Sequence, residues 1–97
     1  MAIYTVFGYC SCHACTGKWA KYHKTADGHT PRQGITCAAP KAFKFGARLN
    51  IEGIGERVVQ DRMSVRYRLG HFLDIYFERH HDALLFGRQL LEVTVIG

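Results

Sequence analysis

The sequence predicts a mainly β fold, namely a small β-barrel with one short helix. Several short runs are rich in β-branched and aromatic residues, glycines separate these runs, and a single segment has apolar residues at helical spacing. Short strands with turn residues between them are typical of barrels and sandwiches. The chain of 97 residues has the length of one domain, so we expect residues 1–97 to form a single unit.

The expected strands follow one another along the chain. Ile3–Tyr9 is short, β-branched and aromatic, and it predicts the first strand. A polar stretch at residues 18–32 predicts a long loop after that strand. The later strands are expected at Gly34–Ala38, Ala47–Ile51, Glu56–Gln60, His71–Phe77 and Leu90–Ile96. Arg79–Gln89 predicts the helix.

The composition limits the partners that the chain can have. A net charge of +5 and a pI near 9.2 favour an anionic partner, but the basic residues are scattered, which disfavours nucleic acid. No apolar run approaches the ~20 residues of a membrane span. The N-terminus lacks a basic segment followed by a separate apolar one, so we expect no signal peptide and synthesis in the cytoplasm. We expect a monomer.

Four cysteines form the most distinctive local pattern. Cys10, Cys12 and Cys15 lie within six residues, at the start of a long N-terminal loop, and Cys37 follows later. Four thiols could bind one structural zinc ion tetrahedrally, with a nearby histidine in place of one of them. They could equally form disulfides or remain free thiols, and the spacing alone does not separate these three states.

Two aspartates lie beside apolar runs that predict strands. Asp61 follows Val58 and Val59, and Asp74 lies within the run from Phe72 to Phe77. Burying an unpaired carboxylate disfavours its charge and raises its pKa. A raised pKa is what a general acid needs near neutral pH. The alternative is a structural role, since ion pairs and turns perturb carboxylates as readily as active sites do.

A succession of motifs resembles the 3D domain, a family named for three aspartates. The motifs cover almost the whole chain in order: Tyr9-Cys10-x-Cys12-x-x-Cys15, Gly17-Lys18-Trp19, Thr25-Ala26-x-Gly28, Phe45-Gly46-Ala47-Arg48-Leu49-Asn50-Ile51-Glu52-Gly53, Asp74-Ile75-Tyr76-Phe77 and Asp82-Ala83-Leu84-x-Phe86-Gly87-Arg88. The family is similar to barrel-type lytic transglycosylases and rare-lipoprotein-A-like proteins. The resemblance implies a six-stranded double-psi β-barrel whose groove holds a β-1,4-linked glycan, typically peptidoglycan.

The resemblance also implies roles for three acids. Asp74 matches the family's catalytic acid/base, and Asp61 matches an aspartate that shapes the site. The third family aspartate is replaced by Ala39, and Asp27 is an extra acid that we expect to substitute for it in space. The Gly-Gly loop that usually follows the second aspartate is replaced by residues 62–68.

These expectations define a function and two alternatives. We expect a peptidoglycan-cleaving lytic transglycosylase, such as a phage or prophage endolysin, that needs no cofactor for its chemistry and reaches the cell wall after release or delivery. The aromatic and histidine candidates for sugar contacts are Tyr9, Trp19, Tyr67 and His71. The first alternative is a non-catalytic barrel that binds glycan or a protein. The second is a zinc-bearing nucleic-acid-binding domain that uses the four cysteines.

Overall fold

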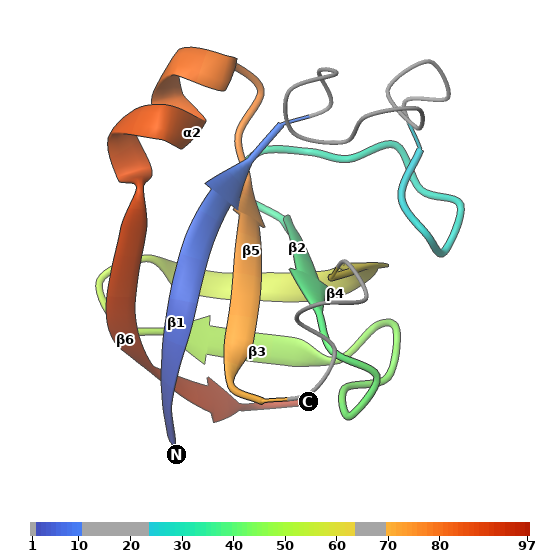
Figure 1. Cartoon of the computed structure of the whole chain (residues 1–97). Coiled ribbons are helices and arrows are strands. Elements are labelled where there is room, and N and C mark those ends of the chain that lie inside the picture. Colours follow the sequence, from blue (N-terminus) through green and yellow to red (C-terminus); the bar gives the residue numbers. More distant parts are fainter. Residues whose placement is uncertain (1, 11–23, 64–69) are drawn as a thin grey trace.

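The computed structural model describes residues 2–10, 24–63 and 70–97, and these form one closed barrel with one short helix (Figure 1). The described elements are β1 (Ala2–Tyr9), β2 (Thr36–Ala39), β3 (Arg48–Ile51), β4 (Gly55–Arg62), β5 (Phe72–Tyr76), α2 (His80–Phe86) and β6 (Arg88–Val95). Six described strands and a single described helix confirm the predicted fold class. Most of the predicted cysteine-containing loop lies outside the described residues.

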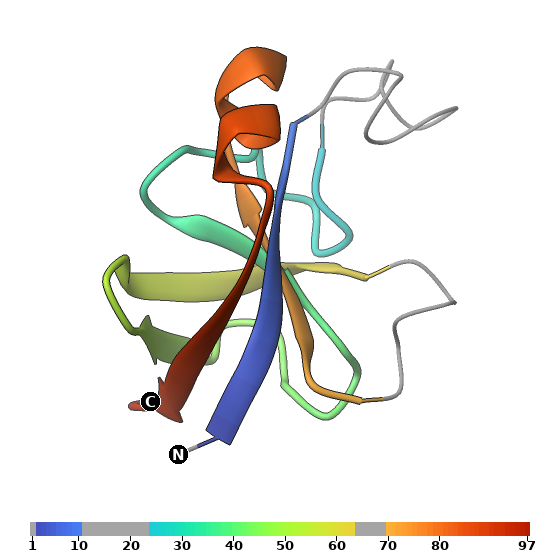
Figure 2. The same ribbon diagram turned by 60° about the vertical axis from the view of Figure 1, so that its left-hand side comes forward.

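The strand order around the barrel is β1-β5-β2-β4-β3-β6, closed by pairing of β6 with β1. Two neighbouring pairs are parallel, β1 with β5 and β2 with β4, and the other pairs are antiparallel. Parallel neighbours require crossover connections rather than hairpins. The crossovers bring β2 between β5 and β4, the two strands that carry Asp74 and Asp61. Figure 2 shows the start of β1 beside the end of β6.

The hydrophobic core lies inside the barrel and is formed by the side chains of alternate strand residues. Val6 of β1, Leu73 and Ile75 of β5, and Leu49 and Ile51 of β3 are almost completely buried. They pack in one cluster with Cys37, Ala39, Val59 and Val93. Successive strand residues point to opposite faces of a sheet. Asp74, between Leu73 and Ile75, therefore lies on the face turned away from this core.

The helix α2 packs against β1 at one end of the barrel (Figure 1). Gly8 permits this contact, because a Cβ atom at position 8 would lie 2.7 Å from the carbonyl oxygen of Ala83 and 3.1 Å from its Cα. The helix ends at Phe86, earlier than the predicted Gln89, because Gly87 has a φ of 65° and turns the chain into β6. No helix within the described ranges is long and apolar enough to cross a membrane.

Replacing Gly8 with alanine should separate α2 from the barrel. The added methyl group meets backbone atoms of Ala83, which cannot rotate away as a side chain could. We expect a loss of about 1–3 kcal/mol in the free energy of unfolding, measured by urea denaturation. Thr5→Ala, on the other face of the same strand, is the control and should cost less. Equal stability of Gly8→Ala and wild type would contradict the close approach of α2.

Candidate active site

Asp61 and Asp74 lie on either side of one small residue, Ala38. In the register of the sheet, Ala38 is the partner of Asp74 on β5 and of Asp61 on β4. Ala38 is itself buried, with only 2% of its surface exposed. Residues paired laterally across a sheet point to the same face. The two carboxylates therefore share one face of the barrel, the face opposite to the core.

A β-bulge in β4 puts Asp61 on this face. Cys37 pairs with Val59, whereas the next residue, Ala38, pairs with Asp61, so β4 has one extra residue, Gln60, at this point. Without the bulge, Asp61 would follow Val59 with period two and point into the core. Bulges re-aim a side chain in this way, and they are common next to active sites.

Aromatic pairs flank Asp74 along its strand. Phe72 and Tyr76, two residues before and after it, share its face by the period of the strand. The ring of Phe72 stacks on that of Phe7, with 6.3 Å between centroids. The ring of Tyr76 meets that of Tyr9 edge to face at 5.5 Å. Asp74 therefore lies along its strand between two aromatic pairs, Phe7 with Phe72 and Tyr9 with Tyr76. We call these four residues of β1 and β5 the aromatic frame.

The surroundings of Asp74 raise its pKa to about 7. Burial is the larger cause because it disfavours the charged form, and the nearby charge of Asp61 adds to it. From the described residues, the Asp74 carboxylate receives no hydrogen bond that would stabilise its charge. This group can hold a proton near neutral pH and release it in the same range, as an acid/base catalyst must.

Asp61 has the opposite surroundings, rich in hydrogen-bond donors. Its Oδ1 accepts hydrogen bonds from the backbone N–H groups of Ala26 at 3.0 Å and Arg62 at 2.9 Å. Its Oδ2 accepts one from the Tyr9 hydroxyl at 3.1 Å. Burial raises the pKa of Asp61, and these donors oppose the rise by stabilising the carboxylate. The pair therefore favours an ionised Asp61 beside a protonated Asp74.

Tyr9 acts first as a donor to Asp61, rather than as an open platform for sugar. Burial raises the pKa of its hydroxyl strongly, and the charges of Asp61 and Asp74 raise it further. The phenol therefore keeps its proton and its hydrogen bond to Asp61 across the physiological pH range. Its ring remains part of the aromatic frame through the contact with Tyr76.

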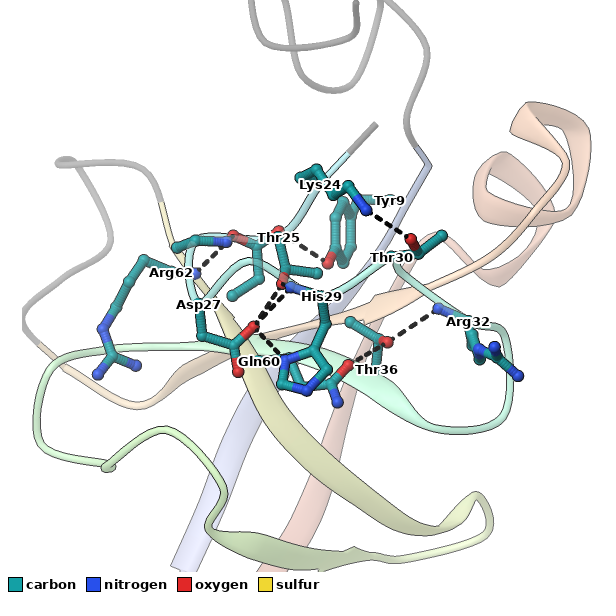
Figure 3. A network of polar contacts seen from close by, with 12 residues as sticks. Tyr9, Lys24, Thr25, Asp27, His29, Thr30, Arg32, Thr36, Gln60 and Arg62 are labelled. Atoms are coloured by element: carbon teal, nitrogen blue, oxygen red, sulfur yellow. Dashed lines mark hydrogen bonds and ion pairs between the residues drawn. The ribbon is translucent and has the colours of Figure 1, made fainter. Parts of the chain in front are cut away.

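Asp27 organises the loop that covers this part of β4 (Figure 3). Its Oδ1 accepts hydrogen bonds from the Thr25 hydroxyl at 2.5 Å and the His29 backbone N–H at 3.3 Å, and it lies 2.8 Å from His29 Nδ1. These contacts lower the pKa of Asp27 against the opposing effect of burial. Its own N–H donates to the Gln60 carbonyl at 3.2 Å, and its charge raises the pKa of Asp61. Asp27 is thus near Asp61, as a stably ionised loop residue.

A second set of contacts ties the same loop to β2 and β4 (Figure 3). The buried Thr36 hydroxyl accepts a hydrogen bond from the Arg32 backbone N–H at 2.9 Å and donates one to Gln60 Oε1 at 2.8 Å. Gln60 is the extra residue of the bulge. The bulge therefore supplies both the position of Asp61 and an anchor for the loop that donates to it.

Of the remaining predicted sugar contacts, the structure describes only His71, which lies away from Asp74. His71 stacks on Tyr4, with 4.7 Å between ring centroids, and its carbonyl accepts a hydrogen bond from the Thr5 N–H. Three residues of extended strand, about 10 Å, separate it from Asp74. Trp19 and Tyr67 lie outside the described residues.

The four predicted metal ligands divide into two groups. Cys12 and Cys15 lie outside the described residues. Cys37 is a free thiol in the barrel core, whereas Cys10 follows β1 and its sulfur lies 3.4 Å from Nδ1 of His80. The described residues contain no cluster of three or more histidine, cysteine or acidic side chains that could hold a metal ion.

Two cavities of about 630 and 660 Å³ lie elsewhere on the barrel. One lies between the turn that joins β3 to β4 and the start of β6, and its lining includes Arg57, Phe77 and Phe86. The other lies between the 30–35 segment and the end of β5, with Tyr76 in its wall. Neither lining includes Asp61 or Asp74. The position of the absent third aspartate, Ala39, is fully buried in the core.

Sequence reasoning missed part of this arrangement. Phe7 and Ala38 were not expected at the site, because their place beside Asp74 follows from strand pairing across the barrel. The alternation of the sequence did indicate two other residues of the site, Phe72 and Tyr76. Within Phe72–Tyr76 it separates the core residues Leu73 and Ile75 from the residues that share the face of Asp74.

No protein-family model matches this chain, and no curated protein matches it. The resemblance to the 3D domain stays a prediction that rests on motifs such as Asp74-Ile75-Tyr76-Phe77. The closed six-stranded barrel agrees with the fold that the resemblance implies. A barrel by itself identifies neither a family nor a reaction, so function must be argued from the two carboxylates.

Proposed function

We propose that this protein cleaves a β-1,4-linked glycan, typically peptidoglycan, by lytic transglycosylase chemistry with Asp74 as general acid and base. One observation carries the proposal. Asp74 and Asp61 flank Ala38 on one face of the barrel, and their surroundings push them toward different protonation states. Neighbouring titratable groups with separated pKa values are a mark of acid/base sites.

The reaction requires one carboxyl group that acts twice. Asp74 in its protonated form donates its proton to the glycosidic oxygen as the bond to the anomeric carbon breaks. The Asp74 carboxylate then removes the proton of the muramyl C6 hydroxyl, whose oxygen attacks the anomeric carbon and closes the anhydro ring. No second catalytic carboxylate and no activated water are needed, in contrast to ordinary paired-carboxylate glycosidases.

Asp61 supports this step through its charge. An ionised carboxylate beside the reacting sugar stabilises the positive charge that develops on the ring. Its hydrogen bonds from Tyr9, Ala26 and Arg62 hold that carboxylate in place before the substrate arrives. Preorganised groups cost no rearrangement at the moment of reaction. The loop acid Asp27 adds negative charge near Asp61 without giving up its own hydrogen bonds.

The charge of the protein fits a cell-wall substrate. A net charge of +5 favours association with an anionic envelope. A phage or prophage endolysin would carry such a domain to the wall after release from the cytoplasm. A nucleic-acid partner is less well supported by the described basic residues, because Arg62 lies over the ring of Phe45 and Arg48 pairs with Glu56.

A non-catalytic barrel that binds glycan is the second candidate. It is favoured by Ala39 at the position of a family aspartate, and by the two cavities whose linings include neither carboxylate. In such a module the aromatic frame would hold sugar rings by stacking, and Asp74 would only accept or donate hydrogen bonds.

Asp74→Asn should abolish glycan cleavage while leaving the barrel folded. The amide has nearly the shape of the protonated acid but cannot transfer a proton, so we expect a loss of at least about 100-fold in the rate of product release. The measurement is digestion of purified peptidoglycan, with soluble products identified by mass. Anhydromuramyl products from the wild type would establish transglycosylase chemistry.

Glu78→Gln is the matched control for this experiment, because it makes the same carboxyl-to-amide change at an exposed position just after β5. It should retain wild-type activity. If wild type and Asp74→Asn release no product but both sediment with insoluble peptidoglycan, the enzyme proposal fails and the binding module stands. Reducing-end products would instead indicate hydrolysis.

The free energy of unfolding should depend on pH in a way that reflects the raised pKa of Asp74. Its folded-state pKa of about 7 lies above the unfolded value, so its protonated form stabilises the fold at low pH. That contribution is lost as pH rises toward 7. Relative to Asp74→Asn, the wild type should lose about 1.4 kcal/mol of unfolding free energy per pH unit between roughly pH 4 and 7. Urea denaturation of both proteins, with Glu78→Gln as control, measures this slope. A stability difference that is constant across this range would contradict the pKa.

A further inference from the structure

An arginine lines the cavity of about 630 Å³ between the β3–β4 turn and the start of β6. Arg57 belongs to β4, where it pairs with Leu49 of β3 and precedes Val59 by two positions. Leu49 and Val59 are both buried in the core. Residues paired across a sheet, and residues two apart along a strand, share one face. The side chain of Arg57 therefore lies on the core face of β4, where it is half-buried.

The charge of Arg57 has no ion-pair partner in the part of the chain that the structure describes. Its Nη1 donates a hydrogen bond to the Glu56 carbonyl at 2.9 Å. Its Nε is buried and has no hydrogen-bond partner among the described residues. Burial disfavours the charged form and lowers the pKa of Arg57 from its usual value. Buried polar groups without a partner are rare and cost free energy, so an anion beside Arg57 would stabilise this side chain.

The walls of the cavity are largely apolar. Phe77 and Phe86 contribute two rings whose centroids are 5.4 Å apart, and Ile54 and Ile75 add aliphatic surface. Sites for small molecules are typically cavities of about 300–1,000 Å³ with apolar walls and a few polar groups. This cavity has a volume in that range and combines such walls with the guanidinium of Arg57.

The lining also includes one acidic residue, Glu52, which is exposed. Its Oε1 accepts a hydrogen bond from the backbone N–H of Glu92 at 3.1 Å, and this contact joins the β3–β4 turn to β6. Among the described ion pairs there is none between Glu52 and Arg57. The guanidinium is therefore available to an anion that enters the cavity.

We propose that this cavity binds a small monocarboxylate with an apolar body. The carboxylate accepts hydrogen bonds from the guanidinium of Arg57, and the apolar body packs against Phe77 and Phe86. A guanidinium presents parallel N–H donors that match the two oxygens of a carboxylate. Both groups are ionised near neutral pH, so binding requires no proton transfer. Neither Asp61 nor Asp74 lines the cavity, so the site is separate from the proposed site of glycan cleavage.

The test is binding of 3-phenylpropionate and of hexanoate to the full chain, measured by isothermal titration calorimetry at neutral pH. The wild type should bind at least one of them with a Kd below about 1 mM, and the uncharged amide of that compound about tenfold more weakly or worse. Arg57→Met keeps an unbranched side chain but removes the charge, and it should weaken carboxylate binding by about tenfold or more. Arg57→Lys keeps a charge without the planar fork and should weaken binding less than Arg57→Met does.

Two controls match these changes. Arg48→Met removes an exposed arginine of β3 that is outside the lining, and it should bind as the wild type does. Glu52→Gln removes the negative charge of the lining and should bind the carboxylate at least as tightly as the wild type. Thermal unfolding gives an independent readout, because a saturating carboxylate should raise the midpoint of the wild type and not that of Arg57→Met.

Three outcomes would overturn the proposal. They are a wild type that binds neither carboxylate, an amide that binds as tightly as its acid, and a folded Arg57→Met that binds unchanged. If Arg57→Met does not fold, the comparison of acid with amide in the wild type decides the outcome.

Discussion

The pairing of β2 with both β5 and β4 is the constraint on which the site depends. It places Ala38 between Asp74 and Asp61, and the bulge at Gln60 makes the pairing possible with both carboxylates on one face. A barrel can accept this because its inside is filled by the alternate residues of the same strands, including Leu73, Ile75 and Val59. The packed core thus holds two acids in register without placing either one inside it.

The electrostatics of the site follow from that register. Asp61 accepts hydrogen bonds from the backbone N–H groups of Arg62 and Ala26 and from the Tyr9 hydroxyl. All three stabilise its negative charge. The burial of Asp74 and the nearby charge of Asp61 both disfavour the charged form of Asp74. Two residues of the same type acquire different properties because donors are gathered on one of them.

The far end of β1 has a different organisation. Gly8 lets α2 approach the backbone, and the start of that helix brings His80 to Cys10. A short helix of seven residues, without a side-chain cap at its N-terminus, gains most of its stability from packing rather than from its own hydrogen bonds.

The sequence alone determined the strands, the helix and the two acids beside apolar runs, because periodicity and glycine turns are local properties of the chain. It also pointed to Asp74 as the acid with apolar neighbours. It could not reveal that Ala38 separates the acids, that Tyr9 donates to Asp61, or that His80 lies beside Cys10. These relations arise from crossovers and from a bulge that shifts the face of every later residue in β4. Tertiary structure decided them because they join residues 23 to 70 positions apart, and no local pattern encodes such pairings.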